Sequence, residues 1–134
     1  MNWKLIAQLS MFSLAMGLAT VFIVPSRVEP VYWLVIFTIC AYVLARNCRD
    51  RLFLHGLCLG VANSVWITAA HVLFFSQYIG GHAQEAAMMQ SMPAPDSPQL
   101  MMAMTGPVIG IVSGVVIGLY ALLAGRFVKA RSDA

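Results

Sequence analysis

Charge is what this sequence has least of. Of its 134 residues only 10% are charged and 60% are hydrophobic, whereas soluble domains carry roughly 25% charged and 45–50% apolar residues. So little charge excludes a chain built as a soluble domain and is typical of a membrane protein. The net charge of +3 comes from basic residues near the ends of apolar runs. No basic patch alternates with exposed aromatics, so nucleic acid is not an expected partner.

Carboxylates and cysteines are also scarce. The three cysteines form no C-x-x-C motif and are expected to be free thiols that pack as small hydrophobes. A proton relay or a cation site inside a membrane normally needs an acidic group, as in small four-helix multidrug exporters, which rely on a membrane carboxylate. Here every acidic residue lies outside the apolar runs, namely Glu29, Asp50, Glu85, Asp96 and Asp133.

Four apolar runs are long enough to cross a membrane as helices. A helix rises 1.5 Å per residue, so about twenty apolar residues span the hydrocarbon core. We therefore expect an all-α integral membrane protein, with four transmembrane helices in a compact bundle that forms a single domain over residues 1–134. A methionine-rich outer loop at 80–99 could include a short interfacial helix at 82–92. The predicted spans cover residues 5–24, 31–45, 52–79 and 100–125.

The basic residues indicate an orientation. Seven of the eight Lys and Arg residues fall at the N-terminus, in the second connection or in the tail 126–134, and only Arg27 falls on the other side. Because Lys and Arg concentrate in cytoplasmic segments, we predict a bacterial inner-membrane protein with both termini cytoplasmic and the lipid bilayer as its surroundings. A cleaved signal peptide is an alternative for the N-terminus, but the apolar run to Val24 exceeds the usual length of about 7–15 residues.

The fourth run repeats glycine on every fourth residue, at Gly106, Gly110, Gly114 and Gly118. Each glycine costs a helix about 1 kcal/mol relative to alanine. Close packing of this glycine zipper on a neighbouring helix must offset that cost. Packing within the chain is favoured over a homodimer, because two other runs have small-residue faces. These faces are Ser10, Ser13, Gly17 and Thr20 in the first run, and Gly56, Gly60 and Ser64 in the third.

The third run is the least apolar of the four. A histidine within a membrane span is a candidate functional residue, yet every carboxylate lies outside the predicted spans. We therefore expect His71 to be hydrogen-bonded to a hydroxyl, an amide or a carbonyl, and favour packing over ligand binding. His55, on the opposite side and near the cytoplasmic end, should be reached by water or lipid phosphate. The candidate polar site on this run consists of Asn63, Ser64, Thr68 and His71.

Methionines crowd the outer loop and the start of the fourth run. Thioethers are soft ligands that select Cu(I), and His82 begins the same segment. The candidate soft ligands are therefore His82, Met88, Met89, Met92, Met101, Met102 and Met104. Packing of flexible methionines onto lipid or onto the bundle is the alternative that we favour.

Part of this segment resembles a known family. Met88-x3-Met92 followed by Gly106-x3-Gly110 is similar to the Met-and-Gly pattern of eukaryotic-type copper transporters, and this resemblance implies Cu(I) transport. It covers only this short segment. Those proteins have three spans with the methionine pair inside a pore-lining helix, whereas the pair here lies in the predicted loop.

No catalytic set is evident. Ser64 and His71 are the closest nucleophile–base pair, yet they are about 10 Å apart along a helix, so we predict a non-enzymatic protein without a cofactor. Our first hypothesis is a function in helix association, with a second copy or a larger membrane complex. The alternative is binding or transport of a small solute, or of a soft metal such as Cu(I). In size and topology the chain is similar to small bacterial inner-membrane proteins, which implies no activity.

Overall fold

Four long helices dominate the computed structural model, which describes residues 1–128. Each of the four, α1, α2, α3 and α6, is long and apolar enough to cross a membrane, so this part of the prediction is confirmed. Most of the predicted tail, including Lys129 and Arg131, lies outside the described residues. In chain order the helices are α1 (Trp3–Phe22), α2 (Glu29–Asn47), α3 (Leu52–Leu73), α4 (Phe75–Gly81), α5 (Ala83–Gln90) and α6 (Pro98–Phe127).

The helix boundaries follow local chemistry. The Asn2 side chain caps α1 by accepting a hydrogen bond from the backbone N–H of Leu5, at 3.1 Å, as N-cap residues commonly do. Prolines lie in the first turns of α2 and α6, where their missing N–H has no partner in the helix in any case. Between α2 and α3 the chain turns through Arg51, whose φ of 55° is left-handed.

The third predicted span is not one continuous helix. Residues 52–79 were expected to form a single span, but α3 ends at Leu73 and α4 begins at Phe75. Phe74 packs edge-to-face on Phe22 at the end of α1, with ring centroids 5.3 Å apart. The sequence stays apolar across the break, so hydropathy does not reveal it. The short helix α5 then lies inside the predicted loop.

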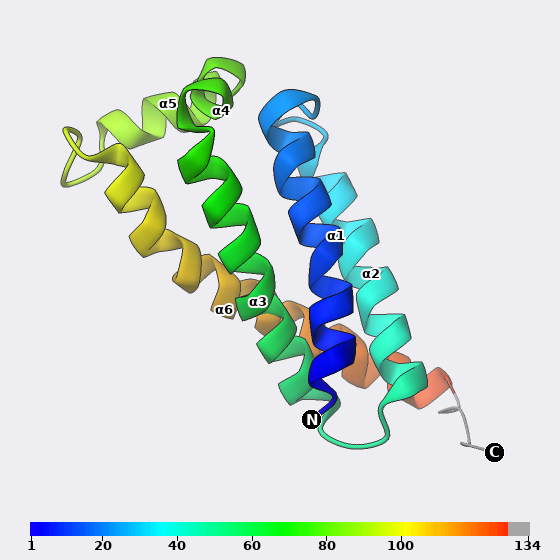
Figure 1. The fold of residues 1–134 in the computed structure, drawn as a ribbon. Helices are drawn as coiled ribbons and strands as arrows, with labels where there is room; N and C mark the ends of the chain where they lie inside the picture. Colours follow the sequence, from blue (N-terminus) through cyan, green and yellow to red (C-terminus); the bar gives the residue numbers. More distant parts are fainter. Residues whose placement is uncertain (129–134) are drawn as a thin grey trace.

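The helix α3 is central to the fold, because its most extensive contacts are with α6 and with α1. Figure 1 shows α6 crossing α3 at a steep tilt. Near the termini, α2, α3 and α6 meet in one hydrophobic cluster, in which Leu44, Leu59 and Ile117 are fully buried. This cluster joins α2 to α6 at that end of the molecule.

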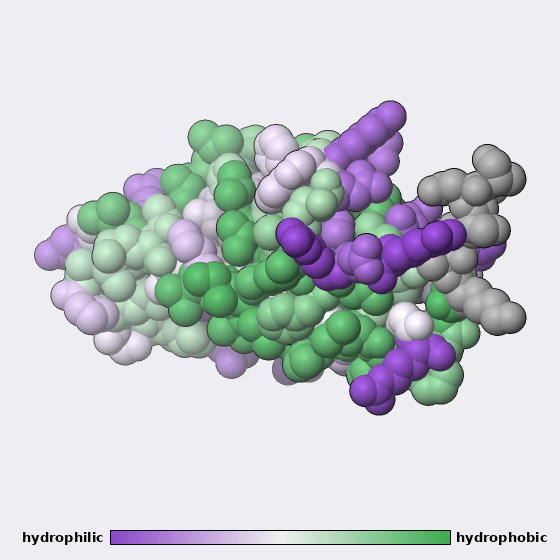
Figure 2. All heavy atoms as spheres, turned by 90° about the horizontal axis from the view of Figure 1, so that it is seen from below, coloured by the Kyte–Doolittle hydropathy of each residue, from purple (hydrophilic) through white to green (hydrophobic). Residues whose placement is uncertain are grey.

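The N-terminus and the end of α6 lie at one end of the molecule, and α4 and α5 lie at the other (Figure 1). We call these the terminal end and the loop end. Viewed from below, the terminal end shows strongly hydrophilic side chains beside hydrophobic surface (Figure 2). The described basic residues on helix ends and in the connection at this end are Lys4, Arg46, Arg49, Arg51 and Arg126.

Candidate functional site

The glycines of α6 face α3. A Cβ added to Gly114 would lie 2.6 Å from the carbonyl oxygen of Leu57 and 3.0 Å from its Cα, so the two backbones are in direct contact. The pairing is antiparallel, because the opposing positions rise along α6 as they fall along α3. The closest opposing pairs are Gly106 with Thr68, Gly110 with Ser64, Gly60 with Gly114, and Gly56 with Gly118.

The small-residue face of α1 also packs on α3. A Cβ at Gly17 would lie 3.3 Å from the Cα of Ile67, and the indole N–H of Trp66 donates to the Ser10 hydroxyl at 3.2 Å. Ser13 is fully buried on the same face. Of the two internal neighbours considered for the glycine row, α3 is therefore the one that α6 contacts most closely.

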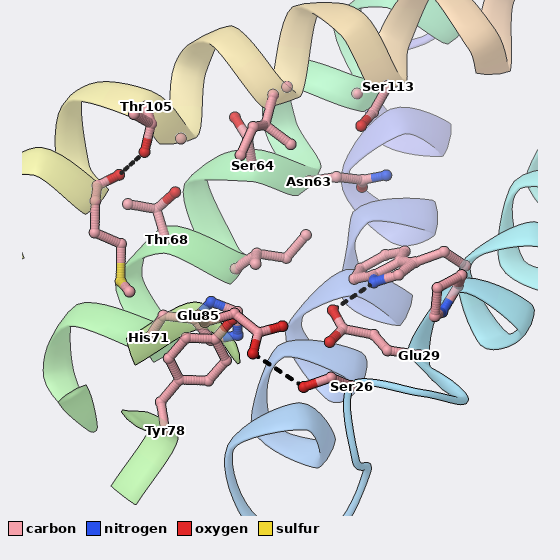
Figure 3. Close-up of a pocket in the computed structure, with 18 of the residues that line it drawn as sticks. Ser26, Glu29, Asn63, Ser64, Thr68, His71, Tyr78, Glu85, Thr105 and Ser113 are labelled. Carbon is pink, nitrogen blue, oxygen red and sulfur yellow. Dashed lines mark hydrogen bonds between the residues drawn. The ribbon is translucent and has the colours of Figure 1, made fainter. Parts of the chain in front are cut away.

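Towards the loop end, a cavity of about 690 Å³ lies among α2, α3, α5 and α6 (Figure 3). All four residues of the predicted polar site line this cavity, namely Asn63, Ser64, Thr68 and His71. Leu34 on α2 and Ile109 on α6 also line it, yet they are 53% and 61% exposed. The cavity therefore opens outward between α2 and α6.

Two carboxylates line the same cavity, although the sequence placed both outside the spans. Glu29 begins α2 and accepts a hydrogen bond from the Trp33 indole at 3.0 Å. Glu85, on α5, accepts from the Ser26 hydroxyl at 3.1 Å. The sequence did not predict that these carboxylates share a cavity with His71, because the fold brings the start of α2 and α5 beside α3. The one available signal was Glu29 directly before Pro30, since acidic residues are favoured in the first turn of a helix.

His71 is tied to α1 by a buried hydrogen bond. Its Nε2 lies 2.9 Å from Oγ1 of Thr20, and that hydroxyl donates its own hydrogen to the carbonyl of Gly17. Nε2 of His71 must therefore carry the proton and donate it, which leaves Nδ1 as an acceptor. The ring stacks on Tyr78 with centroids 4.0 Å apart, and Tyr78 stacks on His82 at 4.4 Å.

His82 closes this stack and has an unpartnered nitrogen. Its side chain is 2% exposed, and Nδ1 donates to the carbonyl of Tyr78 at 2.8 Å. Nε2 has no hydrogen-bond partner among the described residues, and Oε2 of Glu29 lies 3.9 Å from it. Burial raises the pKa of Tyr78, which lies outside the four long helices, and the charges of Glu29 and Glu85 raise it further. The Tyr78 hydroxyl is therefore a stable donor.

Asn63 is the second unpartnered polar group. It lies near the middle of α3, lines the cavity and is 2% exposed. Neither its amide nitrogen nor its oxygen has a partner among residues 1–128. A buried polar group without a partner costs roughly 1–3 kcal/mol, so Asn63, which lines the cavity, favours an additional molecule there that completes its hydrogen bonds.

The methionines divide into two groups. Four of the six line the cavity, namely Met88, Met89, Met92 and Met102, whereas Met101 and Met104 are not among its lining residues. Within the described part of the chain, no group of three His, Cys, Asp or Glu residues could hold a metal ion. The three cysteines are free thiols.

His55 is buried, and the expectation that water or lipid phosphate reaches it is wrong. Its Nε2 accepts a hydrogen bond from the backbone N–H of Asn2 at 2.9 Å, and Nδ1 donates to the carbonyl of Arg51 at 3.0 Å. The N-terminal residues fold over the ring, which is 4% exposed. Hydropathy along α3 alone could not show this contact from α1.

The fold and the cavity define the class as a helical protein with four candidate membrane spans and a mostly apolar cavity that a few polar side chains line. Comparison with protein-family models, curated proteins and solved structures found no match. Function is therefore argued from the side chains around the cavity.

Proposed function

We propose that this chain is a multipass membrane protein that binds a small amphipathic molecule in the cavity among α2, α3, α5 and α6. The cavity itself is the observation that carries the proposal. Its volume of about 690 Å³ falls within the range of roughly 300–1,000 Å³ that is usual for small-molecule sites. Its walls are mostly apolar, and a few polar groups converge on it, which is the composition that fixes the orientation of a ligand.

The opening between α2 and α6 supports entry from the side. The exposed side chains of Leu34 and Ile109 flank it, and in a bilayer they would face the acyl chains. A ligand with an apolar body can therefore partition into lipid first and reach the cavity without crossing the packed contact between α3 and α6.

The proposed orientation places both termini in the cytoplasm of a bacterial cell and the loop end outside the inner membrane. Its support is the basic terminal end, opposite a loop end where Arg27 is the only Lys or Arg. Basic residues are retained on the cytoplasmic side. The carboxylate-bearing part of the cavity then lies near the outer surface.

A matched pair of variants tests the binding proposal. Ile109 and Val112 are both 61% exposed on α6, but only Ile109 lines the cavity. We expect the uncharged fluorophore N-phenyl-1-naphthylamine to bind saturably to the protein in nanodiscs, after subtraction of empty nanodiscs. Ile109→Trp should fill the cavity and weaken binding at least tenfold, whereas Val112→Trp should leave it unchanged. Equal effects of the two variants, or no saturable binding, would contradict the proposal.

Association with a second copy or a larger membrane complex is the second proposed function. The glycine row is engaged with α3, so association would use the exposed side of α2, the least buried of the four long helices. Val35 and Ile39 lie on that side. Disulfide crosslinking of Val35→Cys in native membranes should then capture a dimer or a defined partner, and a strictly monomeric protein would exclude this function.

Cu(I) binding is supported by the four methionines that line the cavity. If thioethers hold the metal, the purified protein should withdraw Cu(I) from a chromogenic chelator such as bathocuproine disulfonate. Replacing Met88, Met89 and Met92 together with leucine preserves volume and should abolish that competition. Unchanged competition after the triple replacement would exclude these ligands.

A further inference from the structure

We infer that the molecule bound in this cavity is an organic cation with an apolar body, an inference that rests on the proposed binding function. The charged groups that line the cavity are acidic. Among the described residues, Glu29 and Glu85 are lining residues and no Lys or Arg is. Figure 3 shows both carboxylates in the same part of the cavity as His71 and Tyr78.

Among the described residues, no Lys or Arg side chain forms an ion pair with these carboxylates. Each has one oxygen engaged by a neutral donor, the indole of Trp33 for Glu29 and the hydroxyl of Ser26 for Glu85. Among residues 1–128 the single ion pair within 4.0 Å is the contact between Glu29 and the imidazole of His82. Charges near a low-dielectric wall attract an opposite charge more strongly than they do in water. The cavity therefore favours a cation at its loop end.

His82 does not line the cavity, but its imidazole lies beside Glu29, which does. Nε2 of His82 and Oε2 of Glu29 lie 3.9 Å apart, which is too far for a hydrogen bond. A positive group in the cavity would pair with this carboxylate. Aromatic rings attract cations through their faces, and Trp33 and Phe37 both line the cavity.

The rest of the cavity indicates the ligand's size and character. Asn63 and Glu29 lie on different helices, and apolar side chains such as Ile67 line the cavity along with them. The two unpartnered amide atoms of Asn63 would form hydrogen bonds with a polar group of the ligand, or with a water molecule bound beside it. A bare inorganic ion would leave most of the volume of about 690 Å³ unfilled. A cation carrying an apolar body fills it.

Two ions of the same shape and opposite charge test this inference. Tetraphenylphosphonium and tetraphenylborate would be measured by equilibrium dialysis against the full chain in zwitterionic nanodiscs, with empty nanodiscs subtracted. We expect the cation to bind at least tenfold more tightly than the anion. The double variant Glu29→Gln with Glu85→Gln should lose at least tenfold in cation affinity, whereas Asp50→Asn, an exposed carboxylate at the terminal end, should lose none.

The uncharged N-phenyl-1-naphthylamine distinguishes a loss of cation preference from a loss of the proposed binding function. If the double variant still binds this probe but has lost cation preference, the variant is folded and the inference holds. Equal affinity of the wild-type chain for both ions, with the neutral probe bound, would overturn the inference and leave the binding function intact. If none of the three probes binds saturably, the proposed function itself fails.

Discussion

Replacing Gly114 with alanine tests the close backbone contact between α3 and α6. The new Cβ would lie 2.6 Å from the carbonyl oxygen of Leu57 and 3.0 Å from its Cα. Ordinary van der Waals contact begins near 3.4 Å, so α3 and α6 must move apart by about 0.8 Å at this point. Both contacted atoms belong to the backbone, and no side-chain rotation can relieve the overlap.

The expected cost follows from three effects. Overpacking a well-packed interior costs about 1–3 kcal/mol, and the upper end applies here because the obstacle is backbone. Separating the helices also forfeits a quarter to a half of the local dispersion energy for a gap of about 0.5–1 Å. Alanine returns about 1 kcal/mol as the better helix former. The free energy of unfolding should therefore fall by about 2 kcal/mol.

Two other glycines supply controls. A Cβ at Gly125 would meet only Cδ1 of Leu52, the end of a flexible side chain, at 2.7 Å, and a Cβ at Gly80 in α4 would meet nothing within 4 Å. Both alanine variants should be neutral or more stable by up to about 1 kcal/mol. Unfolding would be followed by circular dichroism in mixed micelles titrated with dodecyl sulfate. Native mass spectrometry of the same samples would report the oligomeric state.

The outcome separates packing within the chain from packing between chains. If Gly114→Ala were no less stable than Gly125→Ala, the contact between α3 and α6 would not limit stability. If Gly114→Ala only dissociated an oligomer of intact monomers, the glycine row would have a neighbour in another chain.

Two further predictions concern the hydrogen bond of His71 and the orientation in the membrane. Thr20→Val removes the acceptor of the His71 N–H and should cost about 1 kcal/mol in the same unfolding assay, because buried interhelical hydrogen bonds in membranes contribute about that much. The matched control, Thr38→Val, loses only an exposed hydrogen bond within its own helix and should cost nothing measurable; equal losses would refute the importance of the His71 contact. In a cysteine-free background, Ser91→Cys should react with an impermeant maleimide on intact cells, and Asp50→Cys only after permeabilisation. The reverse pattern would overturn the proposed orientation.

Hydropathy predicted the long helices because length and apolar content determine them almost alone. It could not locate the end of α3, since Phe74 and Phe75 are as apolar as a helix interior and the break depends on the contact of Phe74 with Phe22. The glycine spacing predicted close packing but left two possible neighbours. The choice of α3 depends on the register of helices that are some fifty residues apart in sequence.

The candidate site was predicted on one helix only. Helical periodicity placed Asn63 and His71 toward one side of α3, and both line the cavity. Glu29 and Glu85 were missed because the first belongs to a predicted connection and the second to a predicted loop. Periodicity within one segment carries no information about which end of another segment folds beside it.

The antiparallel contact between α3 and α6 has a consequence for biosynthesis. The ribosome completes α3 long before α6, so Gly56 and Gly60 have no opposing backbone until Pro98–Phe127 has been made. The newly made α1 and α3 can pair early, but the wall of the cavity that α6 supplies arrives last. A chain interrupted before α6 would therefore leave bare backbone on α3 open to lipid, to chaperones and to membrane proteases.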